Sequence, residues 1–364
     1  MNKNFYGTRL LQARMFQGYS LQDLGKKIGV SRQYLQKVEN EICPPSEEVL
    51  NCVALELKVT TKFFAKPIEN FLLENQCHFR KAKTTSANIK IRATQQASMF
   101  AELVKFVDRY VEFPEPDFPQ IEISDNESIE KAAEQCREHW NLGLDTPISN
   151  MVRVLENAGA IITTFKSISE KIDAFSTSVL RPMIIENTTN ACRMRFDLAH
   201  ECGHLVMHEG IETGDNETES QAHRFASAFL LPRKAFIKEF SFLENAYRIP
   251  WKKLYELKMR WKVSVAAILR RAKDLNIIDP IQYRNACIYL SRTGQTKQEL
   301  YDQSIAIEKP EIIKEALSLL DSIGEIKHYI DDNGMTISFF EDLSGYVPIN
   351  TNKVVDIKQF RNVS

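Results

Sequence analysis

The most informative absences in this chain of 364 residues concern cysteine pairs, net charge and long apolar runs. Its seven cysteines are odd in number and form no CxxC pair, which argues against a disulfide framework and a zinc ribbon. The net charge is only −1, so any binding to nucleic acid must come from a local module. No apolar run approaches the ~20 residues of a membrane-spanning helix, and MNKNFYGTRLL lacks the apolar core of a signal peptide. We therefore expect a cytoplasmic protein with no membrane partner.

The length of the chain predicts two or three domains, because a domain usually has roughly 100–200 residues. The acidic stretch FPEPDFPQIEISD contains three prolines and is the clearest domain boundary. We expect an α+β protein that is mostly helical and has four parts: an N-terminal domain at 1–67, a helical linker at 68–119, a central domain with a small sheet at 120–290, and a C-terminal region at 291–364. That last region mixes helical and strand-like runs such as MTISFFE, and its role cannot be read from the sequence.

Helical periodicity and strand-like runs predict the elements of the first two hundred and eighty residues. Five short helices are expected in the N-terminal domain, at 8–16, 20–28, 31–40, 46–57 and 61–65. Further helices are expected at 90–111, 128–140, 147–158, 217–231 and over much of 234–276. Strand-like runs lie at 160–166, 173–179 and 181–187, directly before a histidine-rich helix.

The stretch SLQDLGKKIGVSRQYLQKVEN has the pattern of a helix-turn-helix. Ser20 and Ser31 are suited to cap two short helices, and the glycine at Gly29 allows the tight turn between them. Outward-facing side chains of the second helix then offer hydrogen-bonding groups for DNA, namely Arg32, Gln33, Gln36 and Lys37. Gln22, at the start of the first helix, is placed to meet a phosphate.

These residues resemble the helix-turn-helix of the XRE family, the Cro and phage-repressor-like proteins, over about residues 6–64. The resemblance implies binding to a double-stranded DNA operator. Gly25 stands where the family usually has alanine, which weakens the helix slightly. The alternative is a small helical bundle that contacts another protein.

The stretch RMRFDLAHECGHLVMHEG carries histidines at His200, His204 and His208, each four residues after the last. The first two form an HExxH pattern, in which side chains one helical turn apart share a face and can bind one Zn²⁺. Glu201, beside them, is suited to take a proton from water at the metal. The alternative is a packed helix whose histidines bond to backbone carbonyls.

A catalytic zinc site needs a third protein ligand. The following stretch ETESQAHRFASAFLLP offers Glu217, Glu219 and His223. Glu219 and His223 share a helix face, because they are four residues apart, and the residues alone leave them close rivals. The one that does not bind the metal is expected to orient a ligand or polarise the substrate.

RFDLAHECGHLVMH followed by ESQAHRFASAFLLP resembles the ImmA/IrrE family of metallopeptidases. The resemblance implies a zincin-like metallopeptidase fold, zinc bound by His200, His204 and Glu219, and Glu201 as the base. The run DAFSTSVLRPMIIENTTNACRMRF resembles the family's strand pair that leads into the metal helix.

Two residues depart from the family's pattern. Cys202 replaces the usual leucine and is expected to fill a small core space, with a redox-sensing role as the alternative. His223 replaces the usual asparagine, so it stays a candidate ligand or catalytic donor. His208 lies too far along one straight helix to join His200 and His204 on a metal. We expect it at the cleft wall or helix end, with a substrate-facing catalytic role left open.

Residues 253–278 show a second helix-turn-helix-like layout, with Ser264 as an N-cap and Arg270, Arg271 and Lys273 expected on the surface. A similar segment follows the metal site in longer ImmA/IrrE proteins that carry an XRE domain. We expect this segment to support the zinc helices, and a second contact with DNA or a partner is the alternative.

Together the motifs predict a bacterial, phage or mobile-element regulator that binds an operator. We expect a homodimer, because helix-turn-helix repressors usually read paired half-sites. Its zinc endopeptidase domain would cleave a regulatory, repressor-like protein. One rival is a transcription factor whose metal site is structural or senses a ligand. A second rival is an interaction protein of the toxin–antitoxin type.

Overall fold

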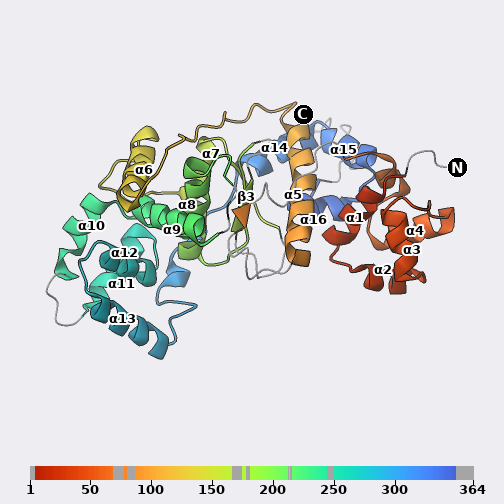
Figure 1. Cartoon of the computed structure of the whole chain (residues 1–364). Helices are drawn as coiled ribbons and strands as arrows, with labels where there is room; N and C mark the ends of the chain where they lie inside the picture. The colour runs from red at the N-terminus through yellow and green to blue at the C-terminus, as the bar shows by residue number, and fades with distance from the viewer. Residues whose placement is uncertain are drawn as a thin grey trace, which may run out of the picture. The chain divides into compact units, whose positions relative to one another are not determined.

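The structure of the chain is a computed structural model that describes residues 5–68, 78–79, 87–165, 174–177, 181–211, 213, 215–243 and 249–349. This part is mostly helical with one small sheet, which confirms the expected α+β class (Figure 1). Its contacts define two compact units: unit 1 comprises Met1–Phe71, Gln95–Glu112 and Ile313–Ser364, and unit 2 comprises Leu72–Thr94 and Phe113–Ile312. The division of the chain into the four expected parts stays a prediction, because contacts do not tell which segment folds by itself.

Unit 1 begins with the short helices expected from the sequence. They are α1 (Gly7–Phe16), α2 (Leu21–Ile28), α3 (Arg32–Glu39), α4 (Glu47–Glu56) and the 3₁₀ helix η1 (Thr61–Ala65). The Ser20 side chain accepts a hydrogen bond from the Asp23 amide, and the Ser31 side chain accepts one from the Tyr34 amide. Gly29 ends α2 with a φ of 74°, a conformation that suits glycine. The predicted caps and turn are confirmed.

Helices distant in sequence complete unit 1. They are the second half of α5 (Ala87–Val107), α14 (Ile312–Ser322), α15 (Glu325–Asn333) and α16 (Ile337–Ser344). The buried ring of Phe339 on α16 lies 4.4 Å from the ring of Phe16 and 5.7 Å from that of Phe63. Thr60 also donates a backbone hydrogen bond to Gly334. The C-terminal helices therefore supply part of the core beneath the N-terminal helices.

The expectation of a strand-like run at MTISFFE is wrong, because most of this run lies in α16. Thr336 caps the helix by accepting a hydrogen bond from the Phe339 amide, a role that threonine performs well. Phe339, Phe340 and Leu343 are buried on its inner face. The β-branched and aromatic composition favours a strand locally, but helical spacing of the buried side chains prevails once the neighbouring helices are present.

Unit 2 contains a sheet of four short strands in the order β1-β3-β4-β2. They are β1 (His78–Phe79), β2 (Ile161–Thr163), β3 (Ala174–Thr177) and β4 (Met183–Glu186). β2 pairs with β4 in parallel, whereas β3 pairs with β4 and β1 antiparallel. The three predicted strand runs are confirmed at their centres, while residues 166, 173, 178 and 179 of those runs lie outside the described residues.

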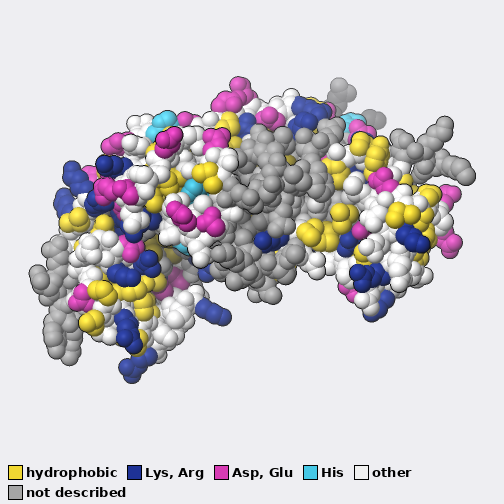
Figure 2. Space-filling model, in the orientation of Figure 1, with side chains coloured by type: hydrophobic (Ala, Val, Ile, Leu, Met, Phe, Trp, Pro, Cys, Tyr) yellow, Lys and Arg dark blue, Asp and Glu magenta, His cyan; other side chains and the backbone are white. Residues whose placement is uncertain are grey.

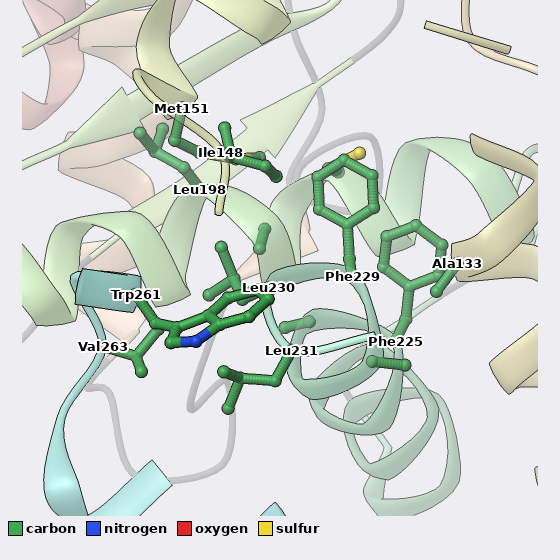
Figure 3. Close-up of a cluster of buried hydrophobic side chains, with 14 of the residues drawn as sticks. Ala133, Ile148, Met151, Leu198, Phe225, Phe229, Leu230, Leu231, Trp261 and Val263 are labelled. Atoms are coloured by element: carbon green, nitrogen blue, oxygen red, sulfur yellow. The ribbon is translucent and has the colours of Figure 1, made fainter. Parts of the chain in front are cut away.

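The helices of unit 2 follow the predicted pattern closely. They are α6 (Asn126–His139), α7 (Met151–Asn157), α8 (Ala191–Met207), α9 (Asn216–Leu230), α10 (Arg233–Phe240), η3 (Ser241–Leu243), α11 (Trp251–Trp261), α12 (Val265–Asp274), α13 (Pro280–Arg292) and η4 (Asp302–Ser304). Figure 3 shows Phe225 and Phe229 of α9 near Ala133 of α6, with Trp261 beside Leu231. None of the described helices is long and apolar enough to cross a lipid bilayer.

Two buried guanidinium groups satisfy carbonyls at the C-terminal end of α9. Arg137 donates to the Phe229 carbonyl at 2.7 Å, and Arg271 donates to the Leu231 carbonyl at 3.0 Å. Arg271 also makes a two-pronged ion pair with the Glu130 carboxylate. The expectation that Arg271 is exposed is therefore wrong. Its guanidinium is buried because it pairs with the Glu130 carboxylate of α6 and with the Leu231 carbonyl at the end of α9.

The other two basic residues of α12 are also engaged. Arg270 is exposed and pairs with Asp274 on its own helix, and the Lys273 ammonium lies 5.1 Å from the centre of the Tyr283 ring. These contacts favour the supporting role of this segment over a second DNA contact. On the face seen in Figure 2, acidic and basic side chains are interspersed, in keeping with the small net charge of the sequence.

Candidate metal centre and DNA-binding surface

Close packing of α8 against α9 builds the candidate metal centre. Asn190 caps α8 by accepting a hydrogen bond from the Arg193 amide, and Asp215 caps α9 in the same manner. A Cβ atom at Gly203 would lie only 3.0 Å from the Phe225 ring. The glycine inside the HExxH pattern therefore permits the approach that brings α9 against the histidine face of α8.

Three side chains converge at this contact. The Nε2 atoms of His200 and His204 are 3.2 Å apart, and the two Glu219 carboxylate oxygens lie 3.5 Å from His200 Nε2 and 3.3 Å from His204 Nε2. Zinc bonds of roughly 2.0–2.1 Å at tetrahedral angles place neighbouring ligand atoms about 3.3–3.4 Å apart. The three groups therefore fit one tetrahedral ion with a fourth position open.

The chemistry of the three groups also suits a metal. Both histidines are buried, and Glu219 is half-buried. Burial raises the Glu219 pKa, but hydrogen bonds from His200 and His204 outweigh that effect and hold the pKa well below its usual value. Glu219 is thus a carboxylate at neutral pH, and two imidazoles with one carboxylate form a ligand set typical of zinc hydrolases.

Glu201 is fully buried beside the two histidines. Its Oε2 atom accepts a hydrogen bond of 2.5 Å from the Ser176 hydroxyl, which β3 contributes. The packing of α8 against the sheet thus fixes one oxygen of the carboxylate. Ser176 was not identified from the sequence, because nothing in its strand distinguishes it from other small polar residues.

His208 lies behind His204 and outside the three converging side chains. Its Nδ1 atom is 2.9 Å from His204 Nδ1, and its Nε2 atom is 2.8 Å from Gln221 Oε1. Since the amide oxygen only accepts, His208 Nε2 must carry the proton, and its Nδ1 then accepts from His204 Nδ1–H. This chain leaves the lone pair of His204 Nε2 directed at His200 and Glu219, which is the tautomer a metal ligand requires.

Burial lowers the pKa of His208, and the nearby His204 ring lowers it further. The neutral ring suits the hydrogen-bond chain, although the helix end favours a cation. Gln221 was missed in the sequence, where its position two residues after Glu219 is the only hint. Cys202 is fully buried and burial raises its pKa well above the ordinary value, so it fills core space as expected.

A pocket of about 630 Å³ adjoins the metal centre. Glu219 and His223 contribute to its wall, together with residues of α8, α12 and the segment before η4. The exposed His223 ring lies 4.6 Å from the His200 ring and 5.7 Å from the Phe196 ring. It stands outside the group of three possible ligands, and it faces the pocket, whereas His208 does not line it.

The predicted DNA-contact residues lie on one exposed part of unit 1. Arg32, Gln33, Gln36 and Lys37 are all exposed on α3, and Gln22 is exposed at the start of α2. Leu35 and Val38 on the opposite face of α3 are buried. A Cβ atom at Gly25 would lie 2.7 Å from the Val30 carbonyl oxygen, so glycine there allows the turn to fold closely over α2.

Comparison with known families supports both halves of this description. Residues 10–64 match the helix-turn-helix family, and residues 155–273 match the family described as the IrrE N-terminal-like domain. No curated protein matches the chain. The chain thus joins an XRE-type helix-turn-helix domain to a metallopeptidase-type domain of the ImmA/IrrE family in one polypeptide.

Proposed function

We propose that this protein is a DNA-binding regulator whose central domain is a zinc-dependent endopeptidase that cleaves a repressor-like protein. The observation that carries the proposal is the convergence of His200, His204 and Glu219 on one point, with a buried carboxylate, Glu201, one residue away. A purely structural metal site has no need of such a base. The toxin–antitoxin alternative has no feature of its own in the structure described.

Each group near the metal has a role in peptide hydrolysis. A bound zinc ion supplies Lewis-acid chemistry, which makes a water molecule acidic near neutral pH and polarises a carbonyl. Glu201 takes the proton of the attacking water and passes it to the leaving amine. Ser176 holds one Glu201 oxygen, which leaves the other to handle the proton.

His223 is the proposed donor to the oxyanion, because its ring lies beside His200 on the wall of the pocket. The pocket itself is proposed to accept a side chain of the substrate. His208, which the sequence left open as a catalytic residue, is instead proposed as a positioning residue that fixes the His204 tautomer.

Zinc binding is expected to separate the rival third ligands. His204→Ala and Glu219→Ala should each weaken zinc affinity by more than ~100-fold, because each removes one of three protein ligands. Removal of a residue that only hydrogen-bonds to a ligand typically costs less than this. His223→Phe should leave the affinity unchanged. The measurement is competition with a chromogenic chelator, supported by elemental analysis of the purified chains.

The His208→Phe variant tests the hydrogen-bond chain in the same assay. It keeps a ring of similar size but removes the acceptor for His204 Nδ1–H, so we expect a ~10–100-fold loss of zinc affinity. Unchanged affinity would assign His208 to packing alone. Full zinc content in His204→Ala would contradict the metal centre itself.

The operator-binding surface is expected to be α3 together with the start of α2. Gln33→Ala and Arg32→Ala should each weaken binding to the protein's own upstream DNA by ~10-fold or more, since a lost base contact costs about 1–3 kcal/mol. Arg292→Ala, an exposed cation of unit 2, serves as the control. A gel-shift assay at low salt makes the measurement, and no shift with the wild type would remove the DNA-binding role.

A further inference from the structure

Unit 1 contains a second pocket, of about 440 Å³, which neither the metal centre nor the DNA-contact residues use. We call it the α1/α5/α15 pocket: Arg9 of α1, Lys66 after η1, Phe106 and neighbours on α5, and Tyr329 and neighbours on α15 form its wall. Its volume lies within the roughly 300–1,000 Å³ usual for small-molecule sites. Every residue of the wall belongs to the compact unit that carries the helix-turn-helix.

The pocket is lined by the largely buried side chain of Tyr329, whose hydroxyl is open to the pocket. Tyr329 is only 6% exposed, and its hydroxyl has no hydrogen-bond partner among the residues that the structure describes. Burial raises the Tyr329 pKa, so the hydroxyl keeps its proton at neutral pH. The hydroxyl is not one of the fully enclosed polar atoms without a partner, so it is open to the pocket and can donate a hydrogen bond to a ligand group there.

The guanidinium of Arg9 is not available to a ligand. It donates to the Glu102 carboxylate at 3.0 and 3.2 Å, to Gln12 at 2.7 Å, and to the carbonyls of Lys66 and Pro67 at 3.2 and 3.0 Å. Arg9 therefore joins α1 to α5 and forms a neutral ion pair at the pocket floor.

The rim of the pocket has an excess of available positive charge. Of the acidic groups on the rim, Glu325 accepts a hydrogen bond of 2.7 Å from the Tyr110 hydroxyl, and Asp332 pairs with Lys62 at 3.2 Å. Arg109 forms no salt bridge among the described residues, whereas the charge of Lys66 acts on Asp332 and lowers its pKa. An anion entering the pocket would thus meet the Arg109 guanidinium, a second cation that is only partly neutralised, and a proton donor.

The pocket also has an aromatic wall. The Phe106 ring lies 4.5 Å from the Tyr329 ring and 5.2 Å from the Tyr110 ring. We propose that the α1/α5/α15 pocket binds a small anionic metabolite, whose phosphate or carboxylate group meets Arg109 and the Tyr329 hydroxyl while its apolar part lies against Phe106. A hydroxyl this deep in a concave pocket is out of reach of the phosphates of duplex DNA, which favours a small ligand.

Isothermal titration calorimetry on the full chain tests the site, with pyrophosphate and citrate as probes at fixed ionic strength. We expect saturable binding of at least one probe by the wild type. The probe that binds more tightly shows whether the pocket takes a phosphate or a carboxylate group. Arg109→Ala and Tyr329→Phe should each lower the affinity for that probe at least ~10-fold. The first removes a charged hydrogen-bond donor to the anion, and the second removes a neutral one. Lys327→Ala, an exposed cation of α15 outside the pocket wall, should bind as the wild type does.

Tyr329→Phe also separates binding from folding. Since its hydroxyl has no partner within the described fold, the variant should melt at or above the wild-type temperature without ligand. The proposal is overturned if the wild type binds neither probe, or if Arg109→Ala and Tyr329→Phe both bind as the wild type does. It is also overturned if Arg109→Ala lowers DNA affinity in a gel shift while probe binding is unchanged, since DNA would then be the occupant.

Discussion

Glu201→Gln is expected to abolish peptide-bond cleavage while the metal centre stays intact. The substitution keeps the shape of the buried side chain, and its amide oxygen can still accept the hydrogen bond from the Ser176 hydroxyl. What it removes is the carboxylate that accepts the proton of water, and loss of a general base typically costs ~10²–10⁴ in rate. Zinc content should equal that of the wild type, because Glu201 is not among the three converging ligands.

The assay incubates the purified chain with candidate repressor-like proteins, the products of neighbouring genes first, and follows the chain and each candidate by mass spectrometry. Glu209→Gln is the matched control, because Glu209 is an exposed glutamate in the same stretch of sequence. This variant should cleave the substrate as the wild type does. If wild type and Glu201→Gln alter repression of a reporter differently and yet neither ever cleaves a protein, the metal site is a sensor or a structural site and the endopeptidase proposal fails.

Arg271→Met is expected to destabilise unit 2 by about 3 kcal/mol, the lower end of the cost of breaking a buried ion pair. The variant leaves the Glu130 carboxylate buried without its two-pronged partner and leaves the Leu231 carbonyl without a donor. Arg233 and Arg224 lie 3.7 and 3.9 Å from Glu130 and offset part of the loss. Urea denaturation followed by tryptophan fluorescence makes the measurement, because all three tryptophans lie in unit 2.

Two further variants make this result interpretable. Arg270→Met removes an exposed cation from the same helix and should change stability by no more than ~0.5 kcal/mol. The double variant Arg271→Met/Glu130→Met removes both charges, so it should recover much of the lost stability. A loss of the same size in the double variant would assign the effect to packing rather than to charge.

Local signals made much of this molecule predictable from sequence. The serines and the glycine of the helix-turn-helix act through hydrogen bonds within a few residues, so their roles could be inferred without knowledge of the fold. The HExxH spacing places two histidines on one helix face by helix geometry alone. The proposed third ligand is different: only packing of α9 against α8 separates Glu219, which lies beside His200 and His204, from His223, which lies at the pocket wall.

Contacts between distant segments could not be predicted in this way. Ser176, which hydrogen-bonds to Glu201, lies on strand β3. Gln221 of α9 hydrogen-bonds to His208 at the C-terminal end of α8. Arg271 looked exposed because a basic residue on an amphipathic helix is usually in solvent, and its partner Glu130 lies 141 residues away. The helical state of Thr336–Ser344 likewise depends on neighbours that are distant in sequence.

The position of Phe339 has a consequence for synthesis of the protein. Its ring contacts Phe16 and Phe63, so the core beneath the DNA-binding helices contains side chains from near both ends of the described chain. A ribosome adds roughly 5–20 residues per second and releases the N-terminal segment first. The helix-turn-helix segment therefore waits tens of seconds for Phe339, and its core is completed only after residue 339 has been synthesised.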